Sequence, residues 1–109
     1  MFRRKYKVKG EDVNDYMVMQ DFAYVVYAIS LIKSYVIKNG YSKKVVEGIK
    51  MNIENSTNQL VCIKNLMFTQ DFLMYLDSFN IQESNNKVLV ETRFFNAKNE
   101  LCATLVLKT

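Results

Sequence analysis

The alternation of apolar and polar residues predicts one strand at the start of the chain and four in its second half. In residues 2–9 every second side chain is basic, so this strand has one apolar and one solvated face. The later strands are expected to form a meander at residues 60–68, 72–82, 87–95 and 101–107. A turn is expected at Ser84-Asn85-Asn86. The apolar face of residues 72–82 is expected to hold Leu73, Tyr75, Phe79 and Ile81.

Asp21–Lys38 has the clearest helical pattern in the chain. Its apolar residues recur at spacings of three and four and cover nearly all sides, which predicts a buried helix. Asp21 is the expected N-cap, and Asn39-Gly40 is the expected end of the helix. Residues 10–20 show no period and are expected to form a loop. Residues 42–58 fit both a strand and a helix, and we expect a short helix or an irregular segment there.

This order of elements predicts an α+β fold in a single domain, residues 1–109. An antiparallel sheet of about five strands can bury the long apolar helix by wrapping around it. A chain of 109 residues leaves no room for a second domain. Hydrophobic residues make up 50 % of the chain, which is enough to build a packed core.

The positive charge is concentrated at the start of the chain. The net charge is +4, but residues 1–9 hold five cations and no acid, so the remaining hundred residues carry −1. A nucleic-acid binder is more uniformly basic, and we expect no nucleic-acid partner. The longest apolar stretch, residues 22–37, is shorter than the roughly twenty residues of a membrane span, and no signal sequence is visible. We therefore expect a cytoplasmic protein without membrane contact.

The chain has no histidine, which excludes several kinds of site. No Ser-His or Cys-His nucleophile and no imidazole base can form. Two cysteines, Cys62 and Cys102, do not make a usual zinc site without histidine, and we expect them to be ordinary buried thiols in a reducing compartment. Proline is absent and glycine occurs three times, so a glycine-rich phosphate loop is excluded. We therefore expect neither a metal nor a cofactor.

Three landmarks around the predicted helix resemble a known family. Asp12-Val13-Asn14 follows the first strand, Tyr24 lies twelve residues after Asp12, and Gly40 lies sixteen residues after Tyr24. This spacing resembles that of hotdog-fold thioesterases of the 4-hydroxybenzoyl-CoA thioesterase type, which carry Asp-Thr-Asp, Tyr and Gly at these places. Residues 66–71 and 100–104 extend the resemblance over essentially the whole chain. The resemblance implies a hotdog fold and at least a dimer, with each active site at the subunit interface.

The family's catalytic acid falls on Asn14, which cannot act as a base or a nucleophile. An asparagine can still donate a hydrogen bond to a carbonyl oxygen or orient a water molecule. Thioesterases of enediyne polyketide pathways look similar here, because they also carry Asn at this position and are thought to polarise the thioester. Those enzymes also use a helix Arg, whereas the internal cation of this helix is Lys33, one position away.

The resemblance implies two catalytic residues and four substrate-binding residues. Asn14 would polarise the thioester, and the backbone N–H of Asp21 at the helix N-terminus would help to form an oxyanion hole. The implied substrate-binding residues are Asp12, Met17, Tyr24 and Lys33. Several of these residues have a structural alternative. The acids are also explained as solvated loop residues, and Met17 as a residue that fills the core. The helix tyrosines Tyr24, Tyr27 and Tyr35 are also explained as core residues whose hydroxyls find partners.

Two functions from different classes follow from these residues. The first is hydrolysis of an acyl-CoA or acyl-carrier-protein thioester by a homodimer or homotetramer. The second is a non-catalytic hotdog protein that binds acyl groups or has a structural role, which the missing catalytic acid favours. The basic residues of the first strand would contact CoA phosphates or an acidic carrier protein, or would form only a solvated strand face.

Overall fold

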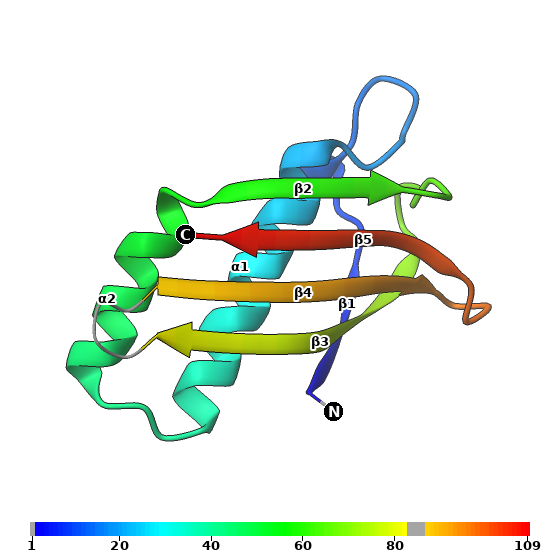
Figure 1. Ribbon diagram of the computed structural model, residues 1–109. Coiled ribbons are helices and arrows are strands. Elements are labelled where there is room, and N and C mark those ends of the chain that lie inside the picture. The colour runs from blue at the N-terminus through cyan, green and yellow to red at the C-terminus, as the bar shows by residue number, and fades with distance from the viewer. Residues whose placement is uncertain (1, 83–86) are drawn as a thin grey trace.

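The computed structural model describes residues 2–82 and 87–109, which form an antiparallel sheet and two helices (Figure 1). In chain order the elements are β1 (Arg3–Lys7), the 3₁₀ turn η1 (Gly10–Asp12), α1 (Asp21–Lys38), α2 (Lys43–Glu54), β2 (Thr57–Cys62), β3 (Asp71–Gln82), β4 (Lys87–Asn96) and β5 (Leu101–Lys108). The five strands and the long helix confirm the predicted α+β architecture. The turn expected at Ser84-Asn85-Asn86 lies outside the described residues. No helix in the described ranges is long and apolar enough to cross a membrane.

The strand order in the sheet is β1-β3-β4-β5-β2, and all neighbours are antiparallel. Strands β3, β4 and β5 form the predicted meander, but the expectation that β2 belongs to it is wrong. Because β3 already has β1 and β4 on its two sides, β2 takes the free side of β5. The two edges of the sheet are therefore β1 and β2.

Strand β2 also begins and ends earlier than residues 60–68, where the sequence predicted it. The backbone leaves the sheet after Cys62, because the N–H groups of Ile63 and Lys64 both donate to the carbonyl of Cys102. Met67 then forms an isolated bridge with Val18 in the loop before α1. The apolar run that predicted a longer strand thus serves to pack this loop against the sheet.

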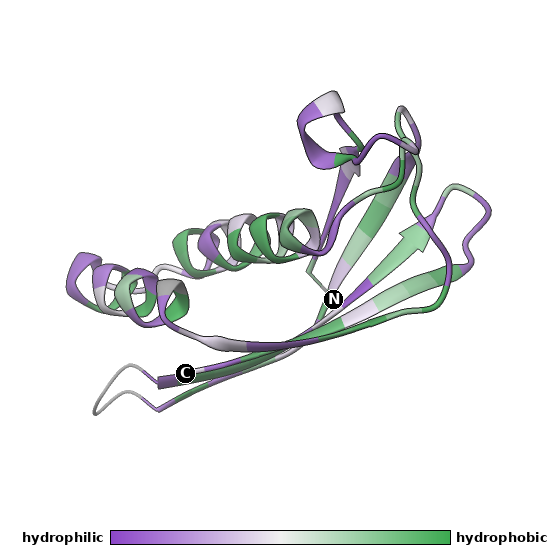
Figure 2. Ribbon diagram, turned by 90° about the horizontal axis from the view of Figure 1, so that it is seen from above, coloured by the Kyte–Doolittle hydropathy of each residue, from purple (hydrophilic) through white to green (hydrophobic). Residues whose placement is uncertain are grey.

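Helix α1 has the predicted bounds and lies on the concave side of the curved sheet (Figure 2). Its N-cap is Gln20, so Asp21 is the first helical residue and not the N-cap that we expected. The predicted C-terminal end is confirmed, since Asn39 is the C-cap and Gly40 has a φ of 71°. Gly40 tolerates this left-handed conformation because it has no Cβ atom.

Only one face of α1 is buried within a single chain. The buried face packs on the sheet and consists of Ala23, Tyr24, Tyr27, Ala28, Leu31, Ile32 and Val36. On the other side, Phe22 and Val26 are 52 % and 57 % exposed. The prediction of a helix buried on all sides is therefore wrong for one copy of the chain, and an apolar surface of α1 stays uncovered.

A bulge in β3 changes which residues face the helix. The register to β4 shifts between Leu76 and Ser78, and one extra residue in a strand reverses the alternation of its faces. Phe72 and Met74 are buried against α1 before the bulge, and Phe79 packs against the core after it. The single apolar face expected for this strand is therefore wrong, because its first two members, Leu73 and Tyr75, project from the outer face.

Residues 42–58, which the sequence left open, contain helix α2. The Ser42 hydroxyl accepts a hydrogen bond from the N–H of Val45 at 3.3 Å and caps the helix. Val46, Ile49 and Ile53 are buried at helical spacing. Packing of this one apolar face therefore resolves the ambiguity in favour of the short helix.

Candidate active site

The loop that leads into α1 is closed at its base by backbone pairing. The carbonyl of Asp12 accepts from the N–H of Gln20 at 2.9 Å, and Val13 forms a bridge with Met19. Above this base, the N–H of Asn14 donates to the carbonyl of Val18 at 3.0 Å. The loop is thus a short, paired excursion that begins beside β1 and ends at the N-terminus of α1.

The side chain of Asn14 organises the tip of this loop. Its Oδ1 accepts from the N–H of Tyr16 at 2.9 Å and from the N–H of Val18 at 3.2 Å. The side-chain oxygen is therefore committed to the loop. The amide nitrogen Nδ2 has no partner within residues 2–82 and 87–109, and Asn14 is exposed. What Asn14 presents to the surface is a hydrogen-bond donor.

Asn14 and Asp21 line the same open surface hollow of about 490 Å³. The other lining residues are Val18, Met19, Gln20, Phe22, Cys62 and Asn65. The first N–H groups of a helix have no intrahelical acceptor, and those of Asp21 and Phe22 have none in the described part of the chain. The hollow therefore brings an amide donor and a helix N-terminus together.

Tyr24 lies beneath this hollow and does not line it. Its side chain is fully buried, its ring packs edge-on against Phe94, and its hydroxyl lies 3.7 Å from Cys62 Sγ. Burial, and then the hydrogen bond to the Cys62 thiol, raise the pKa of Tyr24. Cys62 is exposed whereas Cys102 is buried, and neither forms a disulfide. The expectation of buried thiols is confirmed for Cys102 and is wrong for Cys62.

Met17 and Lys33 lie in very different places. Met17 is at the loop tip, 51 % exposed, with a left-handed φ of 63° that a non-glycine residue rarely adopts. Lys33 is half-buried on α1, twelve residues after Asp21, which corresponds to about 18 Å along a helix. One copy of the chain therefore brings Met17 near the hollow but leaves Lys33 far from it.

Asp12 is buried and points away from the hollow's opening, toward α1. Its Oδ2 accepts from the Tyr27 hydroxyl at 2.5 Å and from the N–H of Lys9 at 2.9 Å. The sequence indicated that Tyr27 is a core residue in need of a partner, but it did not identify the partner. Fifteen residues separate the two side chains, and no spacing rule connects a loop acid to a helix tyrosine.

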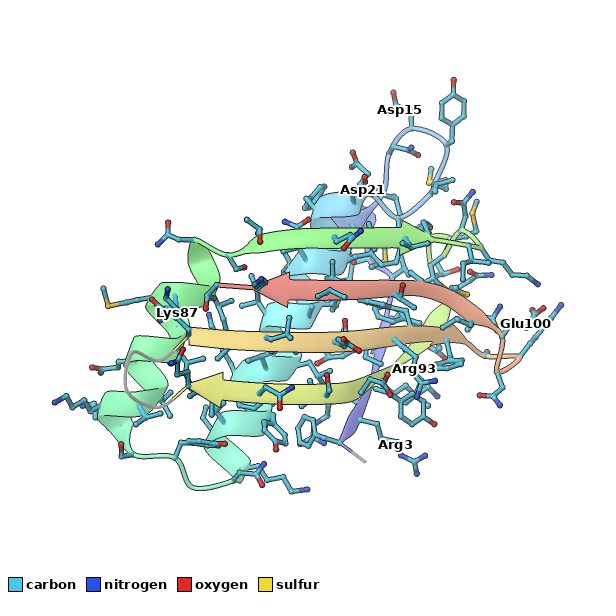
Figure 3. The ribbon with its side chains drawn as sticks, viewed as in Figure 1. Arg3, Asp15, Asp21, Lys87, Arg93 and Glu100 are labelled. Atoms are coloured by element: carbon cyan, nitrogen blue, oxygen red, sulfur yellow. The ribbon has the colours of Figure 1, made fainter. Side chains whose placement is uncertain are left out.

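Charge is distributed unevenly around the hollow. The segment 11–21 contains four acids and no cation, and Figure 3 shows Asp15 and Asp21 at the same end of the molecule. The cations of β1 lie at the far edge of the sheet, and Lys64 forms an ion pair with Glu100. This ion pair lowers the pKa of Glu100 and raises the pKa of Lys64. No cluster of three or more potential metal ligands occurs among the described residues.

The fold is similar to that of solved coenzyme A thioesterases. No protein-family model and no curated protein sequence matches the chain. The 1,4-dihydroxy-2-naphthoyl-CoA thioesterase Slr0204 from Synechocystis superposes with a TM-score of 0.75 at 12 % identity, over 98 % of this chain and 78 % of that one. The gentisyl-coenzyme A thioesterase BH1999 superposes with a TM-score of 0.73 at 11 % identity, over 97 % and 84 % of the two chains. The chain has the hotdog fold.

A third hotdog structure was solved with a ligand. The hypothetical protein SAV2348 from Staphylococcus aureus, in complex with CoA, superposes with a TM-score of 0.71 at 13 % identity. The match covers 98 % of this chain and 66 % of that one, so this chain spans about two thirds of its length. At such identities the likeness establishes the hotdog fold, which confirms the fold class predicted from the sequence.

Proposed function

We propose that this hotdog protein hydrolyses the thioester of an acyl-CoA or an acyl carrier protein. The observation that carries the proposal is the orientation of Asn14, whose side-chain oxygen is held by the loop while its amide nitrogen is free to donate. The similarity of the fold to CoA thioesterases supports the same reaction class. Met17 is an exposed apolar side chain in the loop that carries Asn14, and we assign it contact with the acyl chain.

In the proposed reaction a water oxygen attacks the thioester carbonyl carbon. The Asn14 amide and the N–H groups of Asp21 and Phe22 donate to the carbonyl oxygen as it becomes an oxyanion. One such donor is worth about 3 kcal/mol in a transition state. The carbon–sulfur bond then breaks, and the departing thiolate takes the proton that the water releases. The carboxylate of Asp21 would oppose an adjacent oxyanion, so we assign the role of Asp21 to its backbone.

We also propose that the active form is a dimer joined through β2. Val61 in this strand is 52 % exposed and Ile63 just after it is 57 % exposed. A further hollow connects β2 to the uncovered face of α1, since Asn58 lines it together with Phe22 and Val26. Cys62 ends the strand and lines the candidate site, so a second copy paired on β2 would lie beside that site. Lys33 lies far from the hollow of its own chain. In the proposed dimer it would therefore act only at the hollow of the second copy.

The test is a comparison of two substitutions at Asn14 in an assay of thiol release from acyl-CoA and acyl-carrier-protein thioesters. Asn14→Ala removes both the donor and the acceptor that holds the loop, and we expect a loss of about a hundredfold or more. Asn14→Asp keeps the acceptor for Tyr16 and Val18 and supplies a carboxylate. This variant should stay active or gain activity, with an acid limb in its pH profile.

The alternative is a non-catalytic acyl-binding or structural protein, which the uncharged Asn14 favours. It predicts no thiol release from the parent protein and at most slow turnover by Asn14→Asp. Unchanged hydrolysis by Asn14→Ala would instead mean that the active group is elsewhere, and Asp15 at the exposed loop tip would be the next residue to test.

A further inference from the structure

A buried tyrosine–aspartate pair lies at the base of the loop that carries Asn14. The Tyr27 hydroxyl donates to Asp12 Oδ2 at 2.5 Å, and the N–H of Lys9 donates to the same oxygen at 2.9 Å. Both side chains are buried, with Asp12 only 7 % exposed. Burial of a carboxylate is unfavourable unless hydrogen bonds compensate for the lost water. The Tyr27 hydroxyl supplies that compensation from the middle of α1.

Successive backbone pairings connect Asp12 to Asn14. The Asp12 carbonyl accepts from Gln20, which is the N-cap of α1, and the next pair along the loop is Val13 with Met19. Asn14 then pairs with Val18. Tyr27 therefore holds the Asp12–Gln20 end of this ladder, and the first turn of α1 begins at that same end, directly after Gln20. Asn14 lies at the other end of the ladder.

The Tyr27 ring is itself held in place. It packs against Tyr6 and Phe72 with centroid separations of 5.0 Å to each. Burial, and then the neighbouring Asp12 carboxylate, raise the pKa of Tyr27, so its hydroxyl stays protonated and remains a donor. The tyrosine thus has a fixed ring and a permanent donor.

We propose that Tyr27 is a positioning residue that acts through Asp12. It holds the Asn14 amide and the first turn of α1 in one arrangement around the substrate carbonyl. This inference rests on the proposed hydrolysis, and it gives Asp12 a role in orientation rather than contact with substrate. A displacement of about 1 Å in a reacting group costs up to a hundredfold in rate.

The first experiment compares Tyr27→Phe with Tyr6→Phe. Both variants remove one hydroxyl from the same aromatic cluster, but the Tyr6 hydroxyl makes no hydrogen bond within the described residues. For Tyr27→Phe we expect kcat to fall at least about tenfold while KM stays within about twofold, because orientation and not binding is lost. Tyr6→Phe should keep the parent kcat. Equal kcat values for the two variants would overturn the proposal.

Two substitutions at Asp12 separate orientation from chemistry. Asp12→Asn keeps an acceptor for both Tyr27 and Lys9, and we expect kcat to stay within about threefold of the parent. Asp12→Ala removes the acceptor and should lose as much kcat as Tyr27→Phe, with little further loss in the double variant. A complete loss of activity in Asp12→Asn would show that Asp12 acts as a carboxylate and would overturn the positioning role.

Amide hydrogen exchange tests whether the Tyr27–Asp12 hydrogen bond holds the loop, without any assay of activity. In Tyr27→Phe the N–H groups of Val18 and Gln20 should exchange at least about tenfold faster than in the parent, whereas those of residues 28–36 should be unchanged. Unchanged exchange in the loop would overturn the inference even in an active enzyme. If the parent protein hydrolyses no thioester but the loop of Tyr27→Phe exchanges faster than the loop of the parent, the proposed function is refuted. The role of the Tyr27–Asp12 hydrogen bond in holding the loop is then still supported.

Discussion

The two edge strands of the sheet differ in how they meet solvent. In β1 four of five residues are cations, and in β2 none of six is charged. The backbone of β1 is also partly covered, because the Lys7 carbonyl lies 3.2 Å from the Tyr27 hydroxyl and the Arg3 carbonyl accepts from the Arg4 guanidinium at 3.0 Å. Lysine-rich edges resist pairing with another sheet. The β1 edge is therefore closed to association, and the β2 edge is open.

The surroundings of the two edges differ in the same sense. Beside β2 lie the uncovered residues Phe22 and Val26 of α1, whereas beside β1 the aromatic side chains Tyr6 and Tyr27 pack together. An exposed apolar edge next to an exposed apolar helix face is typical of a protein–protein interface. The proposed dimer would cover both features at once.

The largest expected effect is the loss of folding stability when an acid is placed on the buried face of α1 and not on its exposed face. Ala28 is fully buried and Val26 is 57 % exposed, two residues apart on the same helix. A buried unpaired carboxylate costs several kcal/mol, which approaches the roughly 5–15 kcal/mol stability of a whole domain. Ala28→Asp should therefore abolish the cooperative thermal transition measured by circular dichroism.

Val26→Asp is the matched variant and should fold, because its carboxylate stays in water. By sedimentation it should be a monomer of 12.8 kDa, whereas the parent should have twice that mass. A folded Ala28→Asp protein would show that the helix faces are misassigned. A dimeric Val26→Asp protein would remove α1 from the interface.

The next effect tests the open edge directly. Val61→Lys combined with Ile63→Lys places one cation in β2 and one just after it, and like charges brought together at an interface cost several kcal/mol. We expect the dimer dissociation constant to rise by about a hundredfold or more, since 1.4 kcal/mol corresponds to tenfold. Sedimentation velocity over a range of protein concentrations measures it.

Leu89→Lys provides the control for this effect. Leu89 is 37 % exposed on β4, in the interior of the sheet and away from either edge. The added charge should leave the dissociation constant unchanged. If Leu89→Lys weakens the dimer as much as the β2 variant does, the interface lies on the outer face of the sheet. That result would contradict a dimer joined through the β2 edge.

The sequence predicted those parts of the fold in which one local pattern dominates. Helix α1 has strong apolar periodicity and was placed with correct bounds, and the alternation in β4 and β5 was equally clear. The position of β2 could not be predicted, because pairing with β5 joins residues that are far apart in the chain. The bulge after Leu76 could not be predicted either. An inserted residue moves the following side chains to the opposite face of the strand, and the sequence does not mark where this happens.

The candidate site was predictable only in part, for a similar reason. Spacing after the first strand placed Asn14 beside the start of α1, and the structure brings Asn14 and Asp21 to one hollow. The contact between Tyr27 and Asp12 depends on how the loop folds back, which no sequence period encodes. The resemblance to a helix Arg pointed to Lys33, but the rise of the helix carries Lys33 away from the hollow within one chain.

A smaller effect is expected when the cations that protect the β1 edge are removed. Replacement of Arg3, Lys5 and Lys7 by Thr removes three cations and leaves a strand with high β propensity. We expect species larger than the dimer at protein concentrations about tenfold lower than for the parent, which corresponds to about 1.4 kcal/mol of added association energy. Light scattering across a concentration series measures this.

The control for the β1 variant carries the same change of charge elsewhere. Lys43, Lys44 and Lys98 are exposed and lie outside the sheet edges, so their replacement by Thr should leave the mass distribution unchanged. Association in both triple variants would indicate a general effect of net charge and not a guarded edge.

The smallest effect concerns the loop between the two edges, where Met17 holds a left-handed backbone. A non-glycine residue in this conformation costs about 1–2 kcal/mol, and glycine loses roughly 0.5–1 kcal/mol through its greater freedom when unfolded. Met17→Gly should therefore raise the free energy of unfolding by about 0.5 kcal/mol, a small rise in Tm by calorimetry. Met17→Ala keeps the strained backbone and should give no rise.

If Met17 contacts the acyl chain, both variants should raise KM equally, because both lack its side chain. A rise in KM for only one of them would show that the backbone, and not the thioether, contributes to substrate binding beside the open edge.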